Sequence, residues 1–197
     1  TDKFFIDSLF SNKELNQDLN VGFKGKPHMG AVVLNKYIGS EEFEIFASVI
    51  NENDRIFIVS SIFGGTGAAG FPLLVKNLRK PPESRNIQRP EIVRNSKIGA
   101  ITVLPYFDLN PDLNSEIDSG IFINKTKAAL EYYHSNIVNT KELNALYFIG
   151  DLTKGMYENQ EGESQQKNKA HLIEFLSATA VIDFLEKPDS DLETENA

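Results

Sequence analysis

The residues best suited to chemistry form the glycine-rich stretch Gly64-Gly65-Thr66-Gly67, which follows the apolar run Ile56–Val59. Glycines allow a backbone to come close to a ligand. We expect the apolar run to be a strand and the glycines to open a helix. The first N–H groups of such a helix lack partners, and its dipole favours negative charge. With the Thr66 hydroxyl as a further donor, the stretch predicts an anion site suited to phosphate.

The glycine stretch also allows a simpler interpretation. It is not a P-loop, because no lysine follows the glycines, and it does not match the dinucleotide fingerprint G-x-G-x-x-G. Small residues at this point would also permit tight packing of a strand on a helix without any ligand. The glycines taken alone leave both interpretations open.

Alternating strands and helices are expected to position this turn. Apolar runs predict strands at 56–59, 98–104 and 145–149, and helical spacing predicts helices at 67–80, 121–133 and 170–186, with one kinked helix or two over 29–50. This alternation predicts an α/β fold, with a mostly parallel sheet and helices on both faces. Ligands of such sheets bind at the carboxyl ends of the strands, here 60–67, 105–110 and 150–153.

Three segments resemble the tubulin and FtsZ superfamily. The stretch Asp54–Pro72 aligns without a gap with the family's strand and GGGTGTGAAP loop, although Phe63 and Ala69 stand at two motif glycines. Gly22–Gly30 is similar to GAGGNPEVG, the loop that approaches the terminal phosphate. Ser96–Asp108 resembles the strand that ends in PFxFEG near the ribose.

The resemblance implies a nucleotide-binding domain over residues 1–187, with Rossmann-like tubulin/FtsZ topology and GTP or GDP as ligand. Phosphate would be held by backbone N–H groups of Gly64, Gly65, Thr66 and Gly67, and the outermost phosphate would face Gly25 and Lys26. Asp108 would meet the ribose, with a shift of one residue from the family's acidic position. Asn168, close to the start of the last helix, is the candidate for the base.

Other expected parts of the family are missing from these residues. No glycine-rich first phosphate loop precedes Gly22, and neither an acidic catalytic loop nor a second domain follows Glu186. There is no initiating Met, so we expect a piece of a longer chain. In the family, a neighbouring subunit of a filament completes hydrolysis. The resemblance therefore implies self-association into filaments, and a GTPase only if missing segments or a neighbour complete the site.

Asp151 is the one candidate metal ligand. It follows the strand predicted at 145–149, where its carboxylate would reach a Mg²⁺ carried by the nucleotide. It would equally well cap the next turn. His28, His134 and His171 lack ligand spacing, which favours separate surface histidines over a metal site.

Composition narrows the partners. The formal net charge of −8 argues against DNA or RNA. There is no cysteine, which excludes disulfides and thiolate sites. No apolar run is long enough to span a bilayer and the N-terminus lacks a signal-peptide pattern, so we expect no membrane partner. The lack of cysteine fits the expectation of a cytoplasmic protein. The acidic tail 188–197 is predicted to be disordered.

Two other functions compete with nucleotide binding. The first is a non-enzymatic interaction module, in which the fold is kept and the nucleotide site has decayed; the missing first loop and Ala69 favour it. The second is an enzyme of the general doubly wound class that acts on a phosphorylated metabolite.

Overall fold

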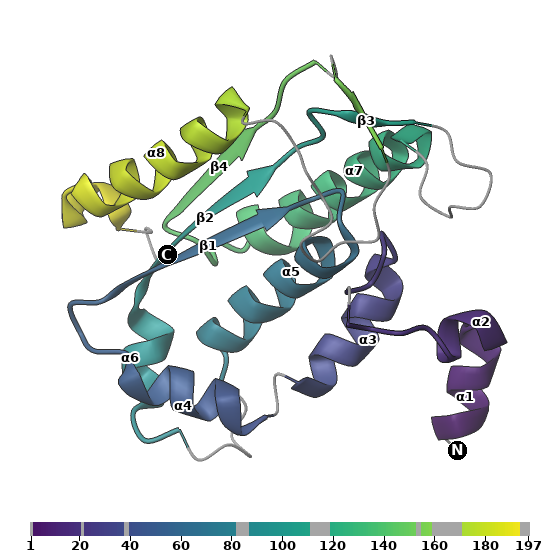
Figure 1. The fold of residues 1–197 in the computed structure, drawn as a ribbon. Coiled ribbons are helices and arrows are strands. Elements are labelled where there is room, and N and C mark those ends of the chain that lie inside the picture. The colour runs from purple at the N-terminus through teal and green to yellow at the C-terminus, as the bar shows by residue number, and fades with distance from the viewer. Residues whose placement is uncertain are drawn as a thin grey trace.

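A small parallel sheet organises the chain. The computed structural model describes residues 2–20, 22–37, 40–81, 87–110, 119–152, 155–158 and 171–193. In these residues, three parallel strands pair in the order β1-β2-β4 (Figure 1): β1 (Arg55–Ser61), β2 (Lys97–Val103) and β4 (Ala145–Ile149). The register pairs Ser60 with Thr102 and Val103 with Ile149. The predicted α/β class and parallel sheet are confirmed.

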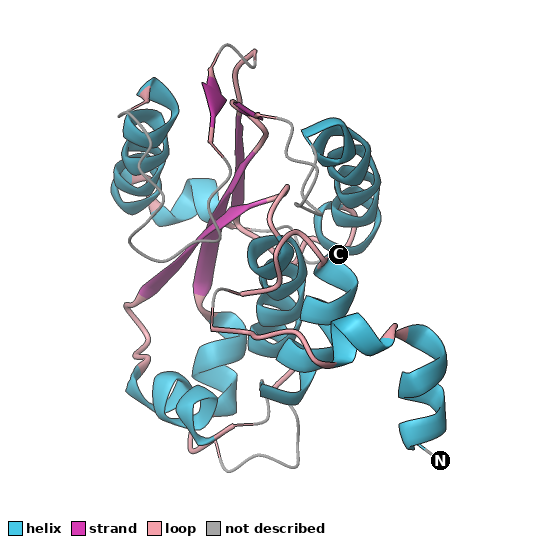
Figure 2. Cartoon of the chain, turned by 45° about the vertical axis from the view of Figure 1, so that its right-hand side comes forward, coloured by secondary structure: helices cyan, strands magenta, loops and turns pink. Residues whose placement is uncertain are grey.

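Long helices cover both faces of this sheet. The helices α5 (Gly65–Arg79) and α7 (Ser119–Tyr133) lie on one side, and α8 (Leu172–Glu186) lies on the other (Figure 2). Strand alternation explains this division, because successive side chains point to opposite faces. On β1, Ile58 joins the core on the α5 side. Its neighbour Phe57 instead contacts Phe184 of α8, with ring centroids 5.4 Å apart.

Shorter elements complete the described chain. The stretch 29–50 forms two helices, α3 (Pro27–Tyr37) and α4 (Glu41–Val49), of which α3 packs along α5. A π-helical turn, His134–Val138, continues α7. The remaining elements are α1 (Asp2–Leu9), α2 (Asn12–Leu15), α6 (Pro90–Asn95) and a parallel pair of two-residue strands, β3 (Asp108–Leu109) and β5 (Met156–Tyr157).

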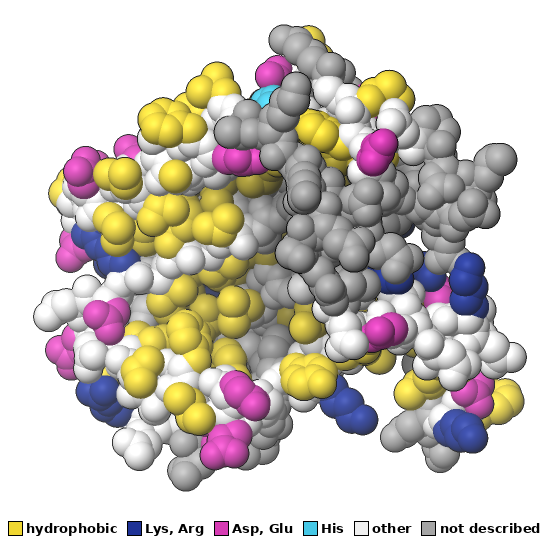
Figure 3. Space-filling view, viewed as in Figure 1, with side chains coloured by type: hydrophobic (Ala, Val, Ile, Leu, Met, Phe, Trp, Pro, Cys, Tyr) yellow, Lys and Arg dark blue, Asp and Glu magenta, His cyan; other side chains and the backbone are white. Residues whose placement is uncertain are grey.

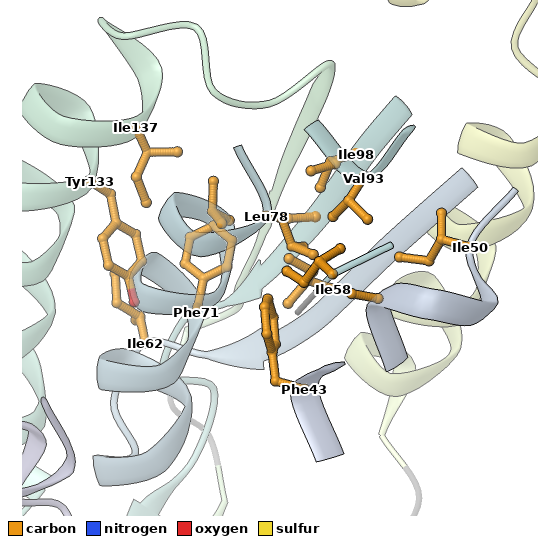
Figure 4. Close-up of a cluster of buried hydrophobic side chains, with 14 residues drawn as sticks. Phe43, Ile50, Ile58, Ile62, Phe71, Leu78, Val93, Ile98, Tyr133 and Ile137 are labelled. Atoms are coloured by element: carbon orange, nitrogen blue, oxygen red, sulfur yellow. The ribbon is translucent and has the colours of Figure 1, made fainter. Parts of the chain in front are cut away.

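The main core lies between the sheet and the helices α5 and α7 (Figure 4). Its fully buried members include Leu78, Val93, Ile98 and Ala100, all at 0 % exposure, packed against Phe71 and Tyr133. Burying each large apolar side chain stabilises the fold by about 1.5–3 kcal/mol. This core holds the start of α5 at the carboxyl end of β1.

Helix α5 contains an internal proline, Pro72. Proline has no N–H, so the carbonyl four residues earlier, that of Ala68, loses its helical partner. The buried hydroxyl of Tyr133 donates to this carbonyl at 3.1 Å. A side chain from α7 therefore supplies the hydrogen bond that Pro72 removes from α5.

The start of the C-terminal tail is ordered, contrary to the prediction of disorder from residue 188. Asp189–Leu192 form a 3-10 helix, and Leu192 is buried. The Asn144 side-chain amide donates to the Leu192 carbonyl at 2.6 Å, and the Arg55 guanidinium pairs with Asp189 at 2.8 Å. The prediction is wrong for residues 188–193, and the rest of the tail lies outside the described residues.

Candidate functional site

The glycine turn connects β1 directly to α5. Gly64 is the N-cap with an extended backbone (φ −81°, ψ 161°), and it makes no side-chain cap hydrogen bond. Gly65, Thr66 and Gly67 form the first helical turn, whose N–H groups have no acceptor within the helix. Thr66 is exposed and Gly64 and Gly67 are half-buried, so the turn reaches the surface. The strand, turn and helix follow each other as the sequence predicted.

Two of these glycines are required by close packing. A Cβ on Gly67 would lie 2.7 Å from the Ser61 carbonyl oxygen. A Cβ on Gly65 would lie 2.7 Å from the Phe23 Cβ and 2.9 Å from the Lys26 nitrogen. Real Cβ atoms do not approach other atoms so closely, so larger residues would force the backbone segments apart.

The Gly65 contacts bring a second predicted loop to the turn. Residues Gly22–Lys26 form a tight turn in which Gly22 (φ 75°) and Gly25 (φ 72°) adopt left-handed conformations that favour glycine. The structure therefore places Gly25 and Lys26 beside the start of α5.

Lys125 is a site residue that sequence reasoning missed. It extends from α7, and its ammonium donates to the Gly25 carbonyl at 2.5 Å. Burial lowers the pKa of Lys125, and the nearby charge of Lys26 lowers it further. The charges of Lys26, within the turn, and of Lys125, on α7, are thus close enough to interact. No local signal marks Lys125, because it lies 100 residues from Gly25 in the chain.

The segment that contains Asp108 also reaches the turn. Phe63, which precedes Gly64, packs edge-on against Phe107 with ring centroids 5.6 Å apart. Asp108 opens β3, is half-buried, and donates its backbone N–H to the Gly155 carbonyl at 2.8 Å. The Asp108 segment and the glycine turn therefore lie at the same end of the sheet.

Asp151 and Asn168 are the remaining predicted site residues. Asp151 is exposed, and its carboxylate accepts the backbone N–H of the next residue, Leu152, at 2.7 Å. Among the described residues, no group of three His, Asp or Glu side chains could hold a metal ion. Asn168, the candidate for the base, lies outside the described residues.

An apolar cavity of about 340 Å³ opens beside the turn, between α3, α5 and α7. Its walls include Gly64, Ala68, Ala129 and Tyr133, with Lys125 among the few polar residues. Small residues on three facing helices leave this space unfilled. The turn therefore has free volume next to it as well as an exposed outer surface.

Comparisons with protein-family models, curated proteins and solved structures give no match to this chain. Within the described part of the chain, no helix has the length and apolar character needed to cross a membrane.

Proposed function

We propose that this chain binds a guanine nucleotide, GTP or GDP, as a divergent tubulin/FtsZ-like domain. The observation that carries the proposal is the contact of the Gly22–Lys26 turn with the first turn of α5. Two segments that resemble phosphate loops meet there, and the first N–H groups of α5 have no acceptor within the helix. Hydrogen bonds from such groups to a charged acceptor are stronger than bonds between neutral groups.

Each residue has a defined part in this proposal. The N–H groups of Gly65, Thr66 and Gly67 hold a phosphate at the positive end of the α5 dipole. Lys26 and Lys125 balance the charge of the outermost phosphate, and the Lys125 bond to Gly25 keeps the loop in place. Asp108 accepts a ribose hydroxyl. A Mg²⁺ ion would enter with the nucleotide, and hydrolysis would need groups from a neighbouring subunit or from further chain.

Calorimetric titration with GTP, GDP and ATP in the presence of Mg²⁺ tests the proposal. We expect heat of binding with both guanine nucleotides and a rise in melting temperature. Gly65→Ala should abolish both effects, because its Cβ would push Phe23 and Lys26 away from α5. Gly70→Ala is the matched control, since its Cβ would meet only the flexible end of Leu34, at 3.2 Å.

A milder variant guards against misfolding of Gly65→Ala. Lys125→Gln should weaken nucleotide binding by about tenfold through loss of a charge-assisted contact. Lys127→Gln, an exposed lysine on the same helix, should leave the affinity unchanged. No heat and no thermal shift with any of the three nucleotides would overturn the proposal.

That negative result would favour the second candidate function, a protein-interaction module. One observation supports this alternative: α8 exposes large apolar side chains to solvent (Figure 3), among them Leu172, Phe175, Ile182 and Leu185, each at least half exposed. Contiguous apolar surface of this kind is typical of contact sites for other proteins.

A further inference from the structure

A second cavity, of about 520 Å³, lies at the opposite end of the sheet from the glycine turn. The end of α5, the end of α6, the start of β2 and the turn before β4 form its walls. These walls carry five basic side chains: Arg79, Lys80, Arg94, Lys97 and Lys141. Two carboxylates, Glu142 and Glu193, share the cavity. Among the described residues that line the cavity, basic side chains thus outnumber carboxylates, in a chain whose overall charge is −8.

The charge of Arg79 is balanced only in part. Its guanidinium donates to three backbone carbonyls, those of Glu142, Arg94 and Ser96, each at 2.7 Å, and to the Asn144 side-chain oxygen at 2.8 Å. All four acceptors are neutral. The Glu142 carboxylate, whose charge acts on Arg79, also pairs with the Lys80 ammonium at 3.8 Å. The hydrogen bonds therefore fix the position of Arg79 without neutralising it.

The helix dipole explains the positions of some of these basic residues, but it does not explain why five of them line one cavity. Arg79 and Lys80 stand at the end of α5, where the helix dipole favours positive charge. Arg94 and Lys97 come from α6 and β2, and within the described residues neither side chain forms an ion pair with a carboxylate. Lys141 enters from a tight turn, with a left-handed φ of 53°. Separate elements thus bring basic residues to one cavity, where repulsion between their charges costs free energy that a bound anion would relieve.

We propose that this cavity binds a small anion with at least two negative charges, either a phosphate ester or a polycarboxylate. Arg94 and Lys97 contact the anion, and Arg79 contributes its fixed charge from the wall. Asn95 and Thr140 offer polar groups at the same wall. This site does not depend on the nucleotide site proposed above, which lies at the other end of the strands.

Titration of the protein with pyrophosphate and with citrate, followed by NMR at constant ionic strength, tests this site. We expect shifts of the signals of Asn95, Thr140 and Asn144, and the anion that gives the tighter binding identifies the ligand class. In Arg94→Gln/Lys97→Gln, affinity measured from these signals should fall by about tenfold or more. Constant ionic strength removes general screening from the comparison.

The matched control is Lys36→Gln/Lys127→Gln, which removes two exposed positive charges away from the cavity. It should bind both anions as the original chain does. Equal loss in the control and cavity variants would show general charge attraction and overturn the site. Absence of shifts at Asn95, Thr140 and Asn144 with both anions at millimolar concentration would overturn it as well.

Discussion

At the scale of single residues, glycines determine how closely the helices and strands approach each other, because a glycine has no side chain. Gly99 lies in the centre of β2, opposite the Phe184 ring of α8. A Cβ at Gly99 would lie 2.7–2.8 Å from three atoms of that ring. Phe184 is fully buried, so its ring has no free space to enter. The contact between α8 and the sheet therefore depends on this glycine.

Gly99→Ala should lower the free energy of unfolding by about 1–3 kcal/mol, because the added methyl group overpacks the Phe184 contact. Denaturant unfolding followed by circular dichroism measures this change. Gly70→Ala serves again as the control, since it adds a methyl group to α5 where a flexible leucine can move. Equal stability of Gly99→Ala and the original chain would contradict the described packing of α8.

Single residues of the candidate site also show what can be predicted from local sequence and what cannot. The glycine turn was predicted because strand, glycines and helix are consecutive residues. Lys125 was not, because its relevance arises only when α7 packs beside the Gly22–Lys26 turn. The basic cavity could not be predicted for the same reason. In the sequence, Arg79, Arg94 and Lys141 are unrelated charged residues, and only the fold brings them together.

At the scale of elements, α5 shows how one helix depends on another. Pro72 leaves the Ala68 carbonyl without a helical donor, and the Tyr133 hydroxyl of α7 replaces it. A buried carbonyl without a partner costs about 1–3 kcal/mol. This coupling gives a test that isolates the hydrogen bond from the surrounding packing.

Tyr133→Phe should lower the free energy of unfolding by about 1–3 kcal/mol in the original chain. In a Pro72→Ala background the loss should be smaller, because the new N–H of residue 72 can bond the Ala68 carbonyl. A double-mutant cycle measured by denaturant unfolding gives the difference. Equal losses in both backgrounds would show that the Tyr133 hydroxyl does not stabilise the fold through the Ala68 carbonyl.

Strands and long helices could be predicted because their periodicity is local. The strands 56–59, 98–104 and 145–149 all lie within or overlap observed strands. The pair β3 and β5 could not be predicted, since each has two residues and exists only through a partner far along the chain. The periodicity also left open whether 29–50 forms one helix or two, and the structure gives two, α3 and α4.

At the scale of the whole molecule, the C-terminal turn closes the amino end of the sheet. Composition predicted disorder because the tail is acidic and has few apolar residues. One of these, Leu192, is nevertheless only 1 % exposed, and its carbonyl accepts a hydrogen bond from the Asn144 side-chain amide. The burial of one side chain and a hydrogen bond to a distant residue therefore order this segment, although its average composition predicts disorder.

Leu192→Ala should lower the free energy of unfolding by about 2–4 kcal/mol, as expected for a fully buried leucine. Asp189→Asn, which only weakens the exposed ion pair with Arg55, should cost less than about 1 kcal/mol. Thermal and denaturant unfolding of both variants provide the comparison. A Leu192→Ala variant as stable as Asp189→Asn would mean that the turn does not remain docked in solution.

The side chain of Asn144 gives this arrangement a dynamic consequence. Its oxygen accepts from the Ile98 backbone N–H and from Arg79, while its amide group donates to Leu192. One residue therefore ties the start of β2, the end of α5 and the C-terminal turn, and none of the three can detach without breaking a bond that orients the others. These segments should open to solvent as one cooperative unit, so the Ile98 amide would exchange its hydrogen only as fast as the chain's C-terminal turn is released.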